Sequence, residues 1–263
     1  MERRLIARGL LAGAVAGTLA FLFARLFAEP VIGRAIVYED GRTAVATVHG
    51  VHEHGVELFT RGVQANAGLG FGVLIFGIAM GALFAVVFCI TYGRVGNLEA
   101  RSFSALLAAI AFIAVYLVPF LKYPANPPAV GQADTIGART GWYLVAVLAS
   151  VMLTVAVVWL ARTLANRLGG WNAGLLAAGL YVVVIAVVMV SLPTVDETPE
   201  PMRDAFGAII YPGFPADVLY QFRLLSLGTQ LVLWAVIGLV FATLAGRLLG
   251  ERADSGRTSS STA

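Results

Sequence analysis

All three histidines of the 263-residue chain lie within six residues, as His49, His52 and His54, and Glu53 stands between the last two. Neutral imidazole is a common ligand of divalent transition metals, and a short histidine-rich tract is a compositional sign of metal binding. In an extended segment His52 and His54 share a face, whereas in a helix His49 shares one with His52 and Glu53. We therefore predict a metal-capturing loop at His49, His52, Glu53 and His54; the alternative is an exposed polar loop without a ligand.

Other sequence signs of catalysis are absent. The single lysine, Lys122, is followed by Tyr123, so the chain has no G-x-x-x-x-G-K-[ST] phosphate loop. The histidine tract is not H-E-x-x-H, and neither G-x-S-x-G nor C-x-x-C-H occurs. We expect a protein that is not an enzyme and has no resident cofactor.

The composition is that of a membrane protein. Hydrophobic residues make up 59% of the chain and charged residues 13%, with a mean hydropathy of +0.84. Soluble domains are about 25% charged. The single cysteine, Cys89, excludes an internal disulfide. The arginines stand singly or in pairs at the ends of apolar runs, which argues against nucleic-acid binding.

Length and apolarity predict an all-α, polytopic helical bundle in one transmembrane domain, residues 1–250. Arg8 and Arg25 weaken the first span, so five spans is the alternative to six. The predicted outward loop 28–68 holds the histidines, and residues 251–263 are expected to form a disordered cytoplasmic tail. The six predicted spans cover residues 5–27, 69–92, 103–121, 142–164, 173–192 and 224–249.

The charges that flank these spans are distributed unevenly. One side carries ten arginines against four acidic residues, and the other carries eight basic against eleven acidic residues. Because basic residues concentrate in cytoplasmic flanks, we expect both termini in the cytoplasm and the histidine loop outside, in a bacterial inner membrane.

Two groups of glycines repeat at helical spacing within the first two predicted spans. They are Gly9, Gly13 and Gly17 in one span and Gly77 and Gly81 in the next. Small residues at this spacing let two helices approach closely in lipid, so we predict helix packing rather than a pore lining.

Several stretches outside the spans resemble the CbtA family of predicted cobalt transporter subunits. The most specific is Lys122-Tyr123-Pro124-Ala125-Asn126-Pro127-Pro128, whose prolines also exclude a helix and predict a rigid, extended connector in the outward loop 122–141. The other stretches are 29–39, the histidine tract, 60–70, 135–140 and 214–223. The resemblance implies a membrane subunit of cobalt uptake tied to cobalamin supply. It also implies a small single-span partner, CbtB, and one span fewer than we predict.

The first functional hypothesis is a permease for Co²⁺, with Ni²⁺ or another divalent metal as alternatives. Its transport-path candidates are Tyr123, Asn126, Arg139 and Arg223, which we expect to form an outer vestibule. Because the predicted spans lack central acids or histidines, the ion would cross on neutral polar groups or with a partner's help. The alternatives are a non-transporting metal sensor or scaffold and, ranked below it, a membrane enzyme acting on a lipid-linked substrate.

Overall fold

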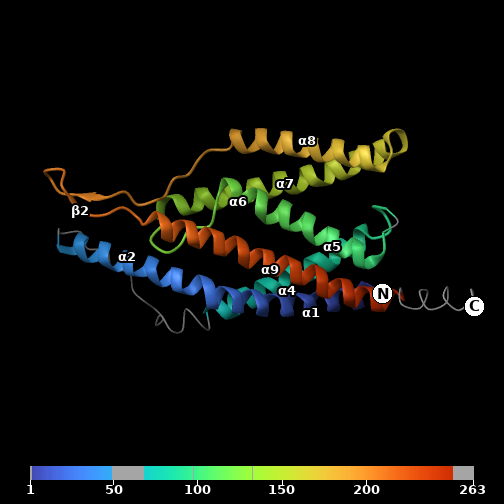
Figure 1. Ribbon diagram of the computed structural model, residues 1–263, viewed down its shortest axis with the longest axis horizontal. Coiled ribbons are helices and arrows are strands. Elements are labelled where there is room, and N and C mark those ends of the chain that lie inside the picture. Colours follow the sequence, from blue (N-terminus) through green and yellow to red (C-terminus); the bar gives the residue numbers. More distant parts are fainter. Residues whose placement is uncertain (1, 49–67, 97, 132, 251–263) are drawn as a thin grey trace, which may run out of the picture.

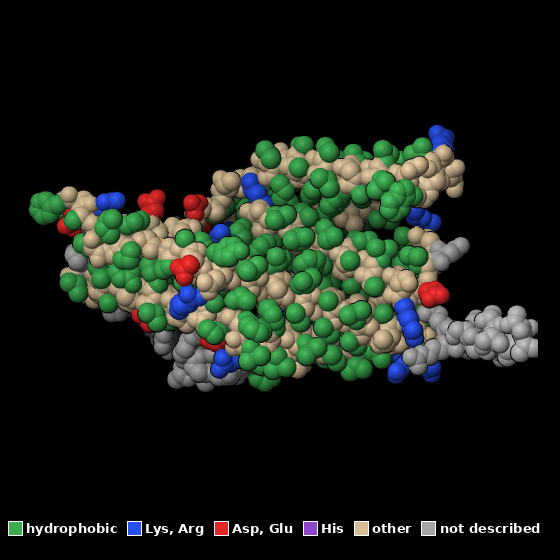
Figure 2. Space-filling model, in the orientation of Figure 1, with side chains coloured by type: hydrophobic (Ala, Val, Ile, Leu, Met, Phe, Trp, Pro, Cys, Tyr) green, Lys and Arg blue, Asp and Glu red, His purple; other side chains and the backbone are tan. Residues whose placement is uncertain are grey.

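The computed structural model describes residues 2–48, 68–96, 98–131 and 133–250. Six helices are long and apolar enough to cross a membrane, which confirms the all-α prediction and the count of six. They run back and forth beside one another, and the start of α1 and the end of α9 lie at the same end of the bundle (Figure 1). Side chains on the face in Figure 2 are mainly hydrophobic between two charged ends, as expected for a surface that faces lipid.

Among the described residues, π-helical turns labelled η1 and η3 lie within two of the helical passages. The first passage is α1 (Glu2–Phe23), η1 (Ala24–Ala28) and α2 (Glu29–Val48), and the second is α4 (Leu69–Thr91). The third is α5 (Ala100–Ala111), η3 (Phe112–Leu117) and α6 (Val118–Lys122). The last three are α7 (Ala133–Leu168), α8 (Gly170–Ser191) and α9 (Ala216–Leu249).

The turns η1 and η3 each end two residues before a proline. Glu29, which precedes Pro30, donates its N–H to Ala24 O, and Val118, which precedes Pro119, donates to Ile113 O. A proline has no N–H and its ring clashes with the carbonyl four residues earlier. A wider turn relieves this conflict, so each helix passes its proline without breaking.

Three predicted boundaries were wrong, because hydropathy marks the apolar part of a helix and not its whole length. Residues 29–48 of the predicted outward loop 28–68 are the helix α2. α7 begins at Ala133, inside the predicted connector 122–141, and α9 begins at Ala216 rather than 224. The histidine tract and the predicted tail 251–263 lie outside the described residues.

The bundle has two parts. α1, α4, α5 and α9 share one core, in which Phe88, Leu233, Ile237 and Phe241 are almost fully buried. α7 and α8 form a hairpin whose contacts with the rest run mainly through α6 and η3 (Figure 1). Within the hairpin, the hydroxyls of Ser150 and Tyr181 are hydrogen-bonded at 2.7 Å.

The glycines of α1 and α4 lie at the contact between these helices, which confirms the packing prediction. A Cβ atom on Gly13 would lie 2.2 Å from Gly77 O, and one on Gly81 would lie 2.2 Å from Gly9 O. No side chain fits at these distances, so glycine permits the two backbones to touch.

A short antiparallel ribbon, which the sequence did not predict, braces α2. It consists of β1 (Met202–Arg203) and β2 (Ile209–Tyr211). Tyr38 on α2 donates its hydroxyl to Pro212 O at 3.0 Å, and Tyr211 donates to Tyr38 O at 3.0 Å. Arg42 donates to Glu200 O at 2.9 Å. These bonds hold α2 beside the ribbon, at the end of the molecule opposite the termini (Figure 1).

Candidate functional site at one end of the bundle

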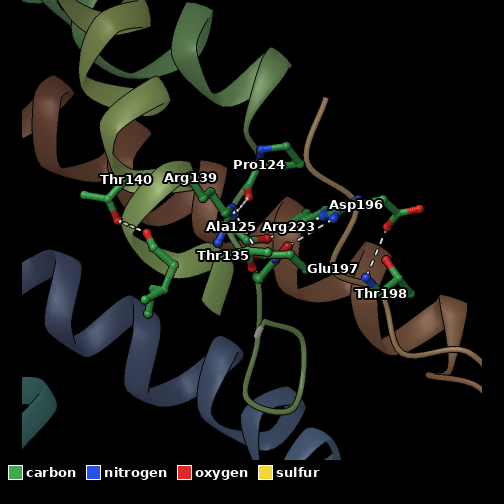
Figure 3. A network of polar contacts seen from close by, with 11 residues as sticks. Pro124, Ala125, Thr135, Arg139, Thr140, Asp196, Glu197, Thr198 and Arg223 are labelled. Atoms are coloured by element: carbon green, nitrogen blue, oxygen red, sulfur yellow. Dashed lines mark hydrogen bonds and ion pairs between the residues drawn. The ribbon is translucent and has the colours of Figure 1, made fainter. Parts of the chain in front are cut away.

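The structure brings the four transport-path candidates to the segments that follow α6 and α8 and to the neighbouring parts of α7 and α9; Figure 3 shows Arg139 and Arg223 among them. Tyr123 and Asn126 belong to the proline-rich segment after α6. Arg139 lies on α7 and Arg223 on α9. A fifth residue, Glu197 in the segment after α8, connects two of them, Asn126 and Arg139.

Glu197 is the acceptor at the centre of this cluster. The residue is only 4% exposed. Its Oε2 atom accepts a hydrogen bond from Asn126 Nδ2 at 3.0 Å and lies 3.4 Å from Arg139 Nε. Its Oε1 atom accepts the hydroxyl of Thr135. A buried carboxylate requires such compensation, because an unpaired charge away from water costs several kcal/mol.

The two arginines bind three consecutive residues of the proline-rich segment. Arg139 donates to Pro124 O. Arg223 donates to Asn126 Oδ1 at 3.1 Å and, through Nε, to Ala125 O at 3.4 Å. The Asn126 side chain thus turns its oxygen to an arginine and its nitrogen to a carboxylate, which is the amide orientation that satisfies both neighbours.

The local sequence explains why these carbonyl groups are available. Residues 124–127 form no helix, as the prolines predicted, so the carbonyls of Pro124 and Ala125 have no helical partner. The segment then turns back through Ala129, which has a φ of 66°, and Val130 donates its N–H to Pro127 O at 3.1 Å. This turn leads into α7, on which Thr135 and Arg139 lie four residues apart and therefore share a face.

Two further contacts hold the segment that follows α8. Tyr123 is 3% exposed and donates its hydroxyl to Pro193 O at 2.7 Å, and burial raises the pKa of its phenol. Asp196 Oδ1 accepts the backbone N–H of Thr198 at 3.1 Å, and this bond lowers the pKa of the Asp196 carboxyl. Glu197 is therefore held in place from both sides.

The sequence alone did not single out Glu197 or Thr135 as site residues. Glu197 stands in a stretch with four acidic residues between 196 and 204, and no local pattern tells which of them is buried. Its role is decided by Arg139 and Asn126, which lie 58 and 71 residues away in the chain.

The predicted metal loop itself stays a prediction. His49, His52, Glu53 and His54 lie outside the described residues, and α2 ends at Val48, directly before the first of them. In the described part of the chain, no group of three or more His, Cys, Asp or Glu residues could hold a metal ion.

The chain belongs to the CbtA family, because the family model described as "Probable cobalt transporter subunit (CbtA)" matches residues 2–246. This match covers nearly the whole chain and confirms the resemblance seen in the sequence. No curated protein and no solved structure matches the chain significantly.

Proposed function

We propose that this CbtA-family chain is the membrane-spanning subunit of a Co²⁺ uptake transporter that serves cobalamin supply in a bacterial inner membrane. The observation that carries the proposal is the family match over residues 2–246 of a chain with six membrane-length helices. An inside-negative membrane potential would drive the ion inward, with a free energy of about 2.3 kcal/mol per elementary charge per 100 mV.

The histidine loop captures the ion outside the membrane in this proposal. The position of α2 supports it, because the tract follows that helix directly. The 20 residues of α2 extend for about 30 Å, at 1.5 Å per residue. Contacts of Arg42 and Tyr38 with residues 200–212 brace the helix that leads to the loop.

The cluster around Asn126, Arg139 and Arg223 forms the outer mouth of the path. It lies at the end of the bundle away from both termini, which the arginine distribution assigns to the outside (Figures 1 and 3). Arg139 has a side chain that is 23% exposed, so water reaches this cluster.

A partner completes the transporter. The family description calls the protein a subunit, and the small single-span CbtB is the partner we propose. Its ligands would assist the ion through the membrane, since no cluster of three or more potential metal ligands occurs in the described spans. The same observation favours the second candidate function, a metal sensor or scaffold that does not itself transport.

Flux into sealed vesicles separates the two functions. The purified chain is reconstituted alone and with CbtB, and Co²⁺ entry is followed with an internal metal-sensitive dye under an inside-negative potential. We expect Co²⁺ to enter. Replacement of His49, His52 and His54 by alanine should raise the half-saturating Co²⁺ concentration about tenfold, the lower end of the loss in metal affinity that follows removal of groups supporting a metal site.

Glu57→Gln serves as a matched control, because it removes a charge from the same loop without removing an imidazole. It should leave entry unchanged. If neither preparation admits Co²⁺ while the loop still binds it, the sensor or scaffold function replaces transport.

A further inference from the structure

Four oxygen atoms of the candidate site are in contact with the guanidinium groups of two arginines. Arg139 pairs with Glu197 Oε2 and donates a hydrogen bond to Pro124 O. Arg223 donates hydrogen bonds to Asn126 Oδ1 and Ala125 O. The two guanidinium groups therefore bind four oxygens from the segments after α6 and after α8, and Figure 3 shows both arginines beside Pro124, Ala125 and Glu197.

We propose that Glu197 and the oxygens of residues 124–126 form a divalent-cation site that Arg139 and Arg223 occupy in the closed state. An arriving ion binds these oxygens and displaces the arginines from them. The proposal rests on the proposed transport function and names the groups that first receive the ion at the outer mouth.

The donor set suits a divalent cation. Carboxylate, amide and backbone carbonyl oxygens are ligands of divalent ions, and a given site generally binds Co²⁺ more tightly than Mn²⁺. Glu197 supplies the negative charge, and its side chain is 1% exposed, so its interaction with a cation is weakly screened. A guanidinium competes for the same oxygens because it is a permanent cation with several N–H donors.

The hydrogen-bond partners of Arg223 distinguish this cluster from an ordinary structural ion pair. One arginine suffices to neutralise Glu197, and Arg139 does so. Arg223 adds a second positive charge, which donates hydrogen bonds to a neutral amide and a backbone carbonyl and is also attracted by the exposed carboxylate of Asp196. Asp196 stands next to Glu197 in the chain and is exposed, with its Oδ1 bound to Thr198 N. The arrangement excludes a further cation until an arginine leaves.

Displacement would also loosen the bundle at this point. Arg139 lies on α7, whose hairpin with α8 contacts the rest of the protein mainly through α6 and η3. Its bond to Pro124 O ties α7 to the segment that follows α6. An ion bound to Glu197 would release this tie, so occupancy of the site and opening of the mouth would be coupled.

Metal binding to the full chain tests the proposal. His49, His52 and His54 are first replaced by alanine, so that the loop does not contribute, and CoCl₂ is titrated calorimetrically into the detergent-solubilised protein. Arg139→Gln in this background should tighten Co²⁺ binding at least about tenfold, because it removes a competing charge a few ångströms away. Adding Glu197→Gln should abolish the gain.

The matched control is Arg34→Gln. Arg34 also pairs with a carboxylate at this end, Asp217 at 3.3 Å, but its side chain is 45% exposed. It should leave Co²⁺ binding unchanged. A folded Arg139→Gln protein without tighter binding, or a gain that survives Glu197→Gln, would overturn the proposal and leave the cluster as a structural clamp.

Two further measurements keep the test decisive if Arg139→Gln does not fold. Arg139→Lys retains the charge but not the two-pronged geometry, so the lysine should compete less strongly for the oxygens. We expect it to tighten Co²⁺ binding, but less than Arg139→Gln does. With both arginines present, millimolar CoCl₂ should speed amide hydrogen exchange in residues 124–139, and unchanged exchange contradicts displacement. Flux into vesicles with the wild-type protein tests transport separately. Co²⁺ entry without these changes in binding and exchange would refute only the proposal that the arginines occupy the cation site.

Discussion

Single polar residues decide how the outer end of the bundle is held together. Glu197 stays buried because an arginine, an amide and a hydroxyl reach it from two other segments. Tyr123 acts in the same way on the neighbouring segment, where its hydroxyl satisfies Pro193 O. Each contact joins residues that hydropathy places in different loops, and each is worth about 1 kcal/mol or more once buried.

Tyr123→Phe tests this view at the residue scale. The change removes one buried hydrogen bond of 2.7 Å and leaves Pro193 O without its donor. We expect a loss of about 1–2 kcal/mol in unfolding free energy, measured as a lower melting temperature in detergent.

The pH dependence of the Tyr123 bond follows from the raised pKa of the phenol. A raised folded-state pKa means that the protonated form is favoured in the folded protein. Its contribution is complete below the ordinary tyrosine pKa of about 10 and is lost as pH rises through the folded value. Tyr123→Phe and wild type should therefore differ by a constant amount from pH 6 to 9; a difference that varied in this range would argue against the bond.

Elements meet closely where glycine or proline alters an otherwise apolar helix. Gly9 and Gly13 on α1 lie against Gly81 and Gly77 on α4, and backbone touches backbone. Elsewhere Pro30 is accommodated by the widened turn η1. The glycines set how closely α1 and α4 approach, and the widened turn lets the first helix continue past Pro30 toward the histidine tract.

Gly13→Leu tests the helix contact. Its Cβ atom alone would lie 2.2 Å from Gly77 O, so α1 and α4 must separate. Overpacking of this kind costs about 1–3 kcal/mol or more, and we expect a lower melting temperature in detergent.

Gly174→Leu on α8 is the matched control for Gly13→Leu, since nothing lies within 4 Å of a Cβ built there. The unfolding free energy of the control should lie within about 0.5 kcal/mol of the wild-type value, as is usual for exposed substitutions. Equal effects of the two changes would contradict the close approach of α1 and α4.

The whole molecule is organised by an even number of passages. Six helices return the chain to its starting side, so the start of α1 and the end of α9 share one end while α2, the β-ribbon and the polar cluster share the other (Figures 1 and 3). A transporter that captures an ion outside requires that this second end face outward.

Cysteine labelling tests that orientation in a Cys89→Ala background. Phe206, between β1 and β2, is 96% exposed, and Leu168 at the turn between α7 and α8 is 45% exposed. We expect an impermeant maleimide to label Phe206→Cys on intact cells and Leu168→Cys only after permeabilisation. The reverse pattern would place the histidine tract inside and refute capture from the outside.

Much of the fold was predictable because membrane insertion depends on local composition. About 20 consecutive apolar residues suffice to identify a span, so the six spans were placed correctly in order and number. The helix ends were not, since α2, the start of α7 and the start of α9 extend beyond the apolar stretches. Residues such as Tyr38 and Val218 stabilise those extensions through contacts distant in sequence.

By itself, then, the amino-acid sequence determined the class of protein, the alternating spans, the glycine contact and the segments characteristic of the family. Only the tertiary structure decided which polar groups meet. Asn126 and Arg223 are 97 residues apart, and Glu197 is buried while its neighbour Asp196 is exposed. The physical reason is that apolar length can be read along the chain, whereas pairing of a buried charge depends on how separate helices pack.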